Sequence, residues 1–293
     1  MNNSAQQSSR RRFLAQVAAI PVVAALKLPA IGEASVPASS HNWGDVVGYD
    51  IDDLIHRSKL AILPLGSVEF HGPSGPAVAD TILAEGIASR VAQRLPAAVF
   101  PVVSYAQCPA NTAGFHGSIS IRPEVMTMLY TDILRGIVAN GFQKVLVLNA
   151  HSGNVGPARA AVAEVTQQHV GTQMIVVNWW ETLTPEVLDR LHLFTSGNGG
   201  HGHGGPLELS ATAVFAPNSV QPGRAPDLPG SEGVGREFPY YMDKSGAPGW
   251  QAYSGKLSEI SRDKGEKLVQ IVVNKIHDLV ANWLEHDKEP GNW

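Results

Sequence analysis

The stretch LPLGSVEFHGPSGPAVAD, residues 63–80, decides how this chain folds. It continues an apolar run that begins three residues earlier and predicts a buried strand ending at Gly66. Glu69 and His71 follow, and side chains two apart in extended backbone point to the same side. The Gly- and Pro-rich turn after them can return Asp80 to the same place. The stretch favours a divalent metal site, because two carboxylates and an imidazole converge on it. The alternative is a surface glutamate and a helix-capping aspartate that never meet.

Strands and helices alternate on both sides of this stretch. Such alternation indicates βαβ units, and hence an α/β fold with a mainly parallel sheet that is covered on both faces. We place Asp80 at the N-cap of the first long helix. The strands are predicted at residues 60–65, 97–105, 144–148 and 172–177, and the main helices at residues 81–95, 123–140, 157–169 and 258–286.

The composition restricts the class of protein and of site. The chain has 293 residues, 44% of them hydrophobic and 16% charged, with a formal net charge of −4, which is ordinary for a globular protein. No basic excess suggests a nucleic-acid partner. Cys108 is the single cysteine, so a disulfide framework and a cysteine-based zinc cluster are both excluded. A metal here must be held by histidines and carboxylates.

The first 38 residues predict an export signal and not part of the fold. SRRRFL, residues 9–14, is a twin-arginine pattern, and an interrupted apolar stretch and candidate cleavage sites near Ala34 and Ala38 follow it. We therefore expect a periplasmic protein exported by the twin-arginine route, with no membrane segment in its mature form and one domain over residues 39–293. The alternatives are a retained basic tail or an uncleaved anchor.

Further candidate ligands lie where other predicted strands end. His151 and Trp179 follow two of these strands, and ligands in parallel sheets gather at the carboxyl ends of strands. Glu208 lies on the helix that follows a Gly/His-rich loop containing His201 and His203. The five candidates Glu69, His71, Asp80, His151 and Glu208 favour zinc, manganese, iron or cobalt.

This set is large enough for two metal ions with Asp80 as the bridge. The alternatives are a structural loop histidine at His151, a solvent-facing Glu208, and a merely metal-sticky tract at the Gly/His loop. Trp179 and Trp180 belong either to the core or to the wall of a pocket.

Three segments together resemble the creatininase (creatinine amidohydrolase) family: residues 66–80, NAHSGN at 149–154 and HGGPLELS at 203–210. The resemblance implies a three-layer α/β/α fold, a dinuclear metal site, hydrolysis of cyclic or linear amides, and a homo-oligomer, as in the hexamer of creatininase. It assigns Glu69 and His151 to one metal, His71 to the second and Asp80 to the bridge.

The same resemblance gives His203 the role of proton transfer. It leaves Glu208 either to complete the second metal's shell or to orient His203. Phe70 and Gly153 depart from the family pattern, which has glutamine and, in creatininase itself, a metal-binding glutamate there. We therefore do not expect creatinine as the substrate.

The resulting expectation is a metal-dependent amidohydrolase that cleaves a C–N bond of a small molecule with a metal-activated water. Two divalent ions are expected per chain, zinc first, with manganese or iron as the alternative at one site. His203 would be the catalytic residue, and Trp179, Trp180 and Ser152 would contact the substrate. Ser152 also supports a second hypothesis, a serine hydrolase, although Ala150 and Asn154 replace the glycines of a nucleophile elbow. A third hypothesis is a non-catalytic periplasmic metal- or solute-binding protein.

Overall fold

The computed structural model describes residues 41–230, 246 and 248–286, and the structural statements below concern these residues. Contacts divide the chain into Met1–Ala38 and Ser39–Trp293, and every described residue lies in the second unit. The predicted twin-arginine signal and its cleavage region lie outside the described residues.

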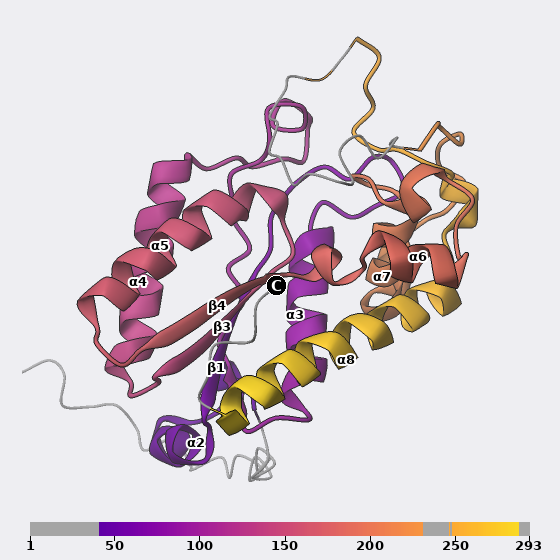
Figure 1. Cartoon of the computed structure of the whole chain (residues 1–293). Coiled ribbons are helices and arrows are strands. Elements are labelled where there is room, and N and C mark those ends of the chain that lie inside the picture. The colour runs from indigo at the N-terminus through magenta and orange to yellow at the C-terminus, as the bar shows by residue number, and fades with distance from the viewer. Residues whose placement is uncertain (1–40, 231–245, 247, 287–293) are drawn as a thin grey trace, which may run out of the picture. The chain divides into compact units, whose positions relative to one another are not determined.

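A four-stranded parallel sheet in the order β2-β1-β3-β4 forms the centre of the fold. Its registers pair Leu65 with Asn149 and Asn149 with Asn178, so the carboxyl ends of β1, β3 and β4 lie side by side. The α/β prediction with a parallel sheet is confirmed (Figure 1). The strands are β1 (Leu60–Leu65), β2 (Ala97–Val99), β3 (Lys144–Asn149) and β4 (Gln173–Asn178).

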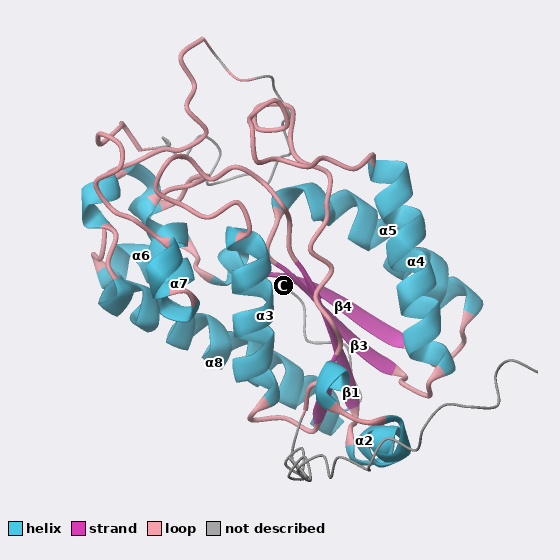
Figure 2. Ribbon diagram, turned by 180° about the vertical axis from the view of Figure 1, so that it is seen from behind, coloured by secondary structure: helices cyan, strands magenta, loops and turns pink. Residues whose placement is uncertain are grey.

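Helices cover both faces of this sheet and give it two apolar cores. Along β1, Leu60 and Ile62 face one core, and Ala61, Leu63 and Leu65 face the other, as the two-residue period of a strand requires. Figures 1 and 2 show the two helical layers on opposite sides. The first core contains α3 (Ala79–Ala92), α6 (Pro185–Leu191), α7 (Pro206–Phe215) and α8 (Arg262–His286), and the second contains α2 (Ile51–Arg57), α4 (Pro123–Ala139) and α5 (Val155–Gln168).

The strand predicted at 97–105 is wrong in length, because β2 ends at Val99. The carbonyl of Pro64 in β1 points to the side of the sheet where β2 lies. It accepts from the amide of Val103, in the segment after β2, at 3.0 Å. Since proline has no N–H, the ladder loses a donor on this side. The chain returns to the sheet only as an isolated bridge between Leu65 and Val103.

Three helix starts also differ from the prediction, and one of them is that of α5, which begins at Val155 instead of residue 157. Asp80 is not an N-cap, because α3 begins at Ala79 after Val78, and Asp80 lies inside its first turn. The last helix begins at Arg262, after a short 3-10 turn at Leu257–Glu259. Among the described helices, none combines the length and apolarity that crossing a bilayer requires.

Helices α7 and α8 approach unusually closely at Gly265. A Cβ placed there would lie 1.9 Å from the carbonyl oxygen of Ser210, so only glycine fits this crossing. The Ser210 hydroxyl also accepts from the amide of Ser261 at 3.0 Å. This contact holds α7, and with it Glu208, against the rest of the fold.

Candidate metal centre

The predicted ligands come together at the carboxyl edge of the sheet. They are supplied by the segment that follows β1, the first turn of α3, the segment that follows β3, and the first turn of α7. In this order they are Glu69 and His71, Asp80, His151, and Glu208, with His203 in the loop before α7.

Asp80 lies at the centre of the group and is buried. Its Oδ2 accepts from the Ser67 hydroxyl at 2.7 Å and lies 2.8 Å from His151 Nδ1. Its Oδ1 lies 3.3 Å from His71 Nε2. The two oxygens of one carboxylate therefore face two different histidines, which is the arrangement a bridging ligand needs.

The position of Asp80 depends on a close contact between the end of β1 and the start of α3. A Cβ at Gly66 would lie 2.4 Å from Thr81 Cα, so glycine lets the strand end touch the helix backbone. The Thr81 hydroxyl donates to the carbonyl of Ser67 at 2.9 Å. The sequence Gly66-Ser67 thus fixes the first turn of α3 beside the strand that carries Glu69.

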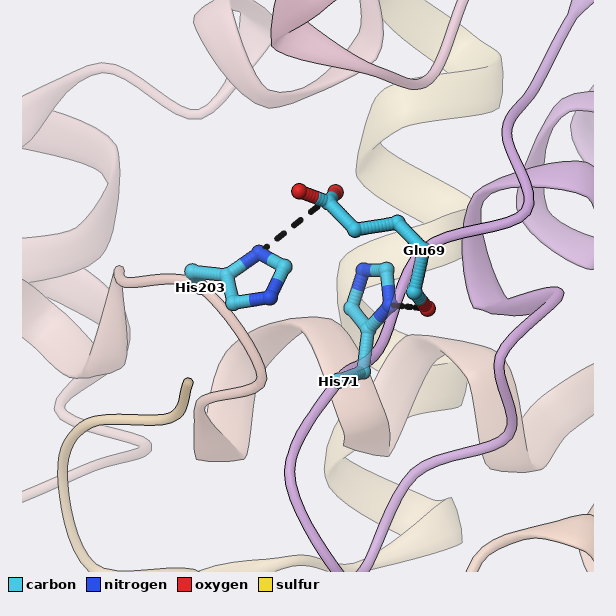
Figure 3. Close-up of side chains that lie close together, drawn as sticks. All are labelled: Glu69, His71 and His203. Carbon is cyan, nitrogen blue, oxygen red and sulfur yellow. Dashed lines mark hydrogen bonds and ion pairs between the residues drawn. The ribbon is translucent and has the colours of Figure 1, made fainter. Parts of the chain in front are cut away.

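His71 presents one ring nitrogen to the centre. Its Nδ1 lies 2.8 Å from the carbonyl oxygen of Glu69, a contact visible in Figure 3. Its Nε2 lies 3.6 Å from Glu208 Oε1 and is buried with no hydrogen-bond partner among the described residues. The other oxygen of Glu208 accepts from the amide of Gly204 at 2.8 Å. A buried imidazole nitrogen between two carboxylates, with no hydrogen-bond partner among the described residues, is suited to bind a divalent cation.

Glu69 and His151 form the other half of the centre. His151 Nδ1 lies 3.1 Å from Glu69 Oε2, and its Nε2 lies 2.8 Å from the carbonyl oxygen of Gln107. Because a carbonyl can only accept, Nε2 carries a proton and Nδ1 is the nitrogen that faces the carboxylates. The Thr112 hydroxyl donates to Glu69 Oε1.

His203 lies at the edge of the group, with 22% of its side chain exposed. Its Nε2 lies 2.7 Å from the carbonyl oxygen of Phe70, so Nδ1 is left facing the site. Figure 3 shows this ring beside that of His71, and the two centroids are 4.4 Å apart. Its Nδ1 lies 3.7 Å from Glu69 Oε2.

Without a metal, the histidines and carboxylates hold each other in charged form. Burial opposes ionisation of Glu69, but the surrounding histidine charges, His151 first, lower the pKa of its carboxyl to about 2. Burial likewise opposes protonation of His151, yet Glu69 and Asp80 raise its pKa to about 10. The same opposition raises the pKa of His71 and lowers that of Asp80. In the metal-free protein, protons therefore supply the positive charge that a cation would bring.

The donors divide into overlapping groups that could each hold a metal ion. One group is Glu69, Asp80 and His151, and another is His71, Asp80 and Glu208. Asp80 belongs to both. A third group, Glu69, His71 and His203, shares its residues with these two. Imidazole nitrogens and carboxylate oxygens without sulfur suit zinc, manganese or iron.

A cavity of about 200 Å³ opens onto this centre. Trp179, Trp180 and Ser152 line it, and so does His201, whereas contact of the first three with a substrate stays a prediction. Trp179 is also buried in the first core. The Ser152 hydroxyl bonds no histidine among the described residues, so the geometry does not favour a serine nucleophile.

A chain of buried amides behind the centre was not predicted. Asn149 Oδ1 accepts from the amide of His151 at 3.0 Å, and Asn149 Nδ2 donates to Asn178 Oδ1 at 2.8 Å. Asn154 donates to Asn149 and to the carbonyl of Gly66, and it accepts from the Tyr130 hydroxyl at 2.7 Å. Burial raises the pKa of Tyr130 and keeps it a donor. The chain ties the ends of β1, β3 and β4 to the backbone of His151.

Comparisons with known proteins identify a family and relatives of this chain. The family model described as Creatininase: Creatinine amidohydrolase matches residues 46–280. Creatinine amidohydrolase of Pseudomonas putida is 27% identical over 234 residues, covering 75% of this chain and 88% of that protein. Mycofactocin precursor peptide peptidase of Mycobacterium tuberculosis is 32% identical over 145 residues, covering 46% of this chain and 53% of the relative.

Solved structures show the same fold. The structure named Creatininase Mn superposes with a TM-score of 0.74 at 21% identity, covering 84% of this chain and 99% of its own. A mutant creatininase of Zn-Zn type gives 0.73 at 22% identity, covering 84% and 98%. Because the family model covers most of the chain and the structures share its α/β architecture, this protein belongs to the creatininase family of hydrolases.

Proposed function

We propose that this protein is a metal-dependent amidohydrolase that cleaves a C–N bond of a small molecule with two divalent ions. The observation that carries the proposal is the position of Asp80, whose two oxygens face His151 and His71 respectively. Glu69 and His151 would hold one ion, and His71 and Glu208 the other. Zinc is the first candidate, with manganese or iron as the alternative at one site.

When bound, divalent ions in such sites lower the pKa of water and polarise a substrate carbonyl. The chain's own residues supply the remaining parts. His203 is held through Nε2 by the Phe70 carbonyl, so its Nδ1 can carry a proton to the departing nitrogen. Trp179 and Trp180 wall the cavity and favour a small, flat group.

The nature of the amide is the open part of the proposal. Relatives of this chain carry names of both a creatinine amidohydrolase and a peptide peptidase. Phe70 and Gly153 depart from the creatininase pattern, which argues for a substrate other than creatinine. We propose a small amide or lactam and expect short peptides to be the competing class in a substrate screen.

The first test measures metal content by elemental analysis of wild type and Asp80→Ala. We expect close to two divalent ions per wild-type chain and a loss of most of them in the variant, because Asp80 belongs to both groups. Wild-type protein that takes up no divalent ion would refute the mechanism.

The second test separates binding from proton transfer. A panel of lactams, linear amides and short peptides, creatinine included, is first screened with the metal-loaded wild type. His203→Ala should then keep both ions and lose about 100-fold or more of the turnover, as expected for a general acid. Full turnover by this variant would show that the role assigned to His203 is wrong.

A further inference from the structure

The loop of residues 106–120 contacts both protein ligands of one proposed ion. Its Gln107 carbonyl faces His151 Nε2 at 2.8 Å, and its Thr112 hydroxyl donates to Glu69 Oε1. We propose that Thr112 and the Gln107 backbone are positioning groups that fix how Glu69 and His151 face the metal. The inference rests on the proposed function.

The loop is fastened to the backbone on both sides of Glu69. The amide of Ile119 donates to the carbonyl of Val68 at 2.9 Å, and the amide of Phe70 donates to the Ser118 hydroxyl at 2.9 Å. The loop's own ends are joined by a parallel bridge. The hydroxyl that Thr112 offers is therefore held in fixed register with the carboxylate it contacts.

Thr112 decides which oxygen of Glu69 is available. The threonine is 1% exposed, and its single hydroxyl proton can go to Glu69 Oε1 or to the carbonyl of Pro109 at 3.1 Å. The carboxylate is the stronger acceptor because it is charged. With Oε1 occupied in this way, Oε2 is the oxygen that faces His151 and His203. The hydroxyl thus presents Glu69 to a cation through one oxygen.

Gln107 performs the matching task for His151. Its carbonyl keeps the proton on Nε2 and leaves Nδ1 toward Asp80 and Glu69. The approach depends on Gly153, since a Cβ at that position would lie 1.8 Å from the Gln107 oxygen and 2.7 Å from His151 Nε2. Glycine at 153 and the carbonyl at 107 are therefore parts of one arrangement.

The test compares metal affinities of Thr112→Val and Thr112→Ser with wild type. Valine keeps the branched shape but cannot donate, whereas serine keeps the hydroxyl. Removing such a supporting hydrogen bond weakens metal binding by about 10- to 100-fold in other sites. We expect a loss of this size at one of the two sites in T112V, and an affinity within about threefold of wild type in T112S. Zn²⁺ affinity is measured by competition with a chromogenic chelator, and the Co²⁺ absorption spectrum reports ligand geometry.

Thr127→Val is the matched control, because among the described residues the Thr127 hydroxyl bonds only within its own helix, to the Pro123 carbonyl at 2.9 Å. This variant should bind as wild type does. If T112V does not fold, Thr112→Ala is measured in the same way, since it makes the same deletion with less bulk. Wild-type affinity at both sites and an unchanged Co²⁺ spectrum in the variant that lacks the hydroxyl would overturn the inference and leave the proposed function intact. Wild type that binds no metal would overturn both.

Discussion

Replacing Asn149 by leucine tests whether the buried amide chain supports the centre. The change keeps the branching at Cγ but removes the partner of the His151 amide and of Asn178 Oδ1. Asn154 keeps a second acceptor in the carbonyl of Gly66. Each buried polar group left unpaired costs about 1–3 kcal/mol, so two of them predict a loss of about 2–6 kcal/mol. Since domains are stable by only about 5–15 kcal/mol, the loss should be large.

The assay is urea unfolding of the chelator-treated protein, followed by circular dichroism. A lower midpoint with an unchanged slope would report lost stability and not a changed unfolded state. Asn274→Leu, on the surface of α8, is the control and should stay within about 0.5 kcal/mol of wild type. An N149L variant within 1 kcal/mol of wild type would refute the reasoning, since ~1 kcal/mol is the lower limit for even one unpaired group.

Two further predictions concern metal uptake and helix packing. The pKa of His151 is raised to about 10, so it is protonated near neutral pH and must release a proton when a metal binds, and the raised pKa of His71 acts in the same direction. Zn²⁺ affinity should therefore rise as the pH rises from about 6 to 9, and calorimetry in buffers of different ionisation enthalpy should detect proton release; a pH-independent affinity would contradict this. Gly265→Ala forces a Cβ against the Ser210 carbonyl and should cost at least about 1–3 kcal/mol in a thermal melt. Gly136 lies on α4 with open space around its Cβ position, so Gly136→Ala should instead raise the stability by about 0.5–1 kcal/mol. Equal changes of stability in the two variants would show that the packing around each glycine does not determine the effect.

The layered fold could be predicted because its signals are local and repeated. The run at 60–65 is buried on both faces, as a continuous apolar strand predicts, and the helices after it carry a 3.6-residue period. The length of β2 was not predictable in the same way. It depends on which neighbour Pro64 faces, and that is set by the pairing of two strands far apart in the sequence.

The candidate ligand side chains could be predicted from the sequence, but the residues that hold them in place could not. Glu69, His71 and His151 could be found because they follow strands whose ends meet at one edge. Asp80 could be found because the Gly- and Pro-rich turn returns it to the same point, and Glu208 because it opens the helix after the Gly/His-rich loop, whereas the family resemblance divided the ligands between two metals. Their metal-binding roles stay predictions.

The residues that support the ligands of the centre could not be predicted from the sequence, for two physical reasons. Gln107 acts through a backbone carbonyl, which any residue type could offer, so its identity carries no signal. Thr112 lies in an irregular loop, where neither a period nor a capping rule applies. The role of Ser67 was easier to predict, because this residue lies within the stretch of residues 63–80. However, a serine at this position also suits a simple turn.

The wide spacing of the ligands has a consequence for when and where the metals are acquired. Asp80 and His151 are 71 residues apart in sequence and meet only after β1 and β3 have paired. An unfolded chain therefore offers no preformed centre, and metal binding adds directly to folding stability. The compartment in which the chain folds then selects its ions from those present there. If the twin-arginine prediction at 9–14 holds, that compartment is the cytoplasm, and the protein would carry cytoplasmic metals to a place with a different supply.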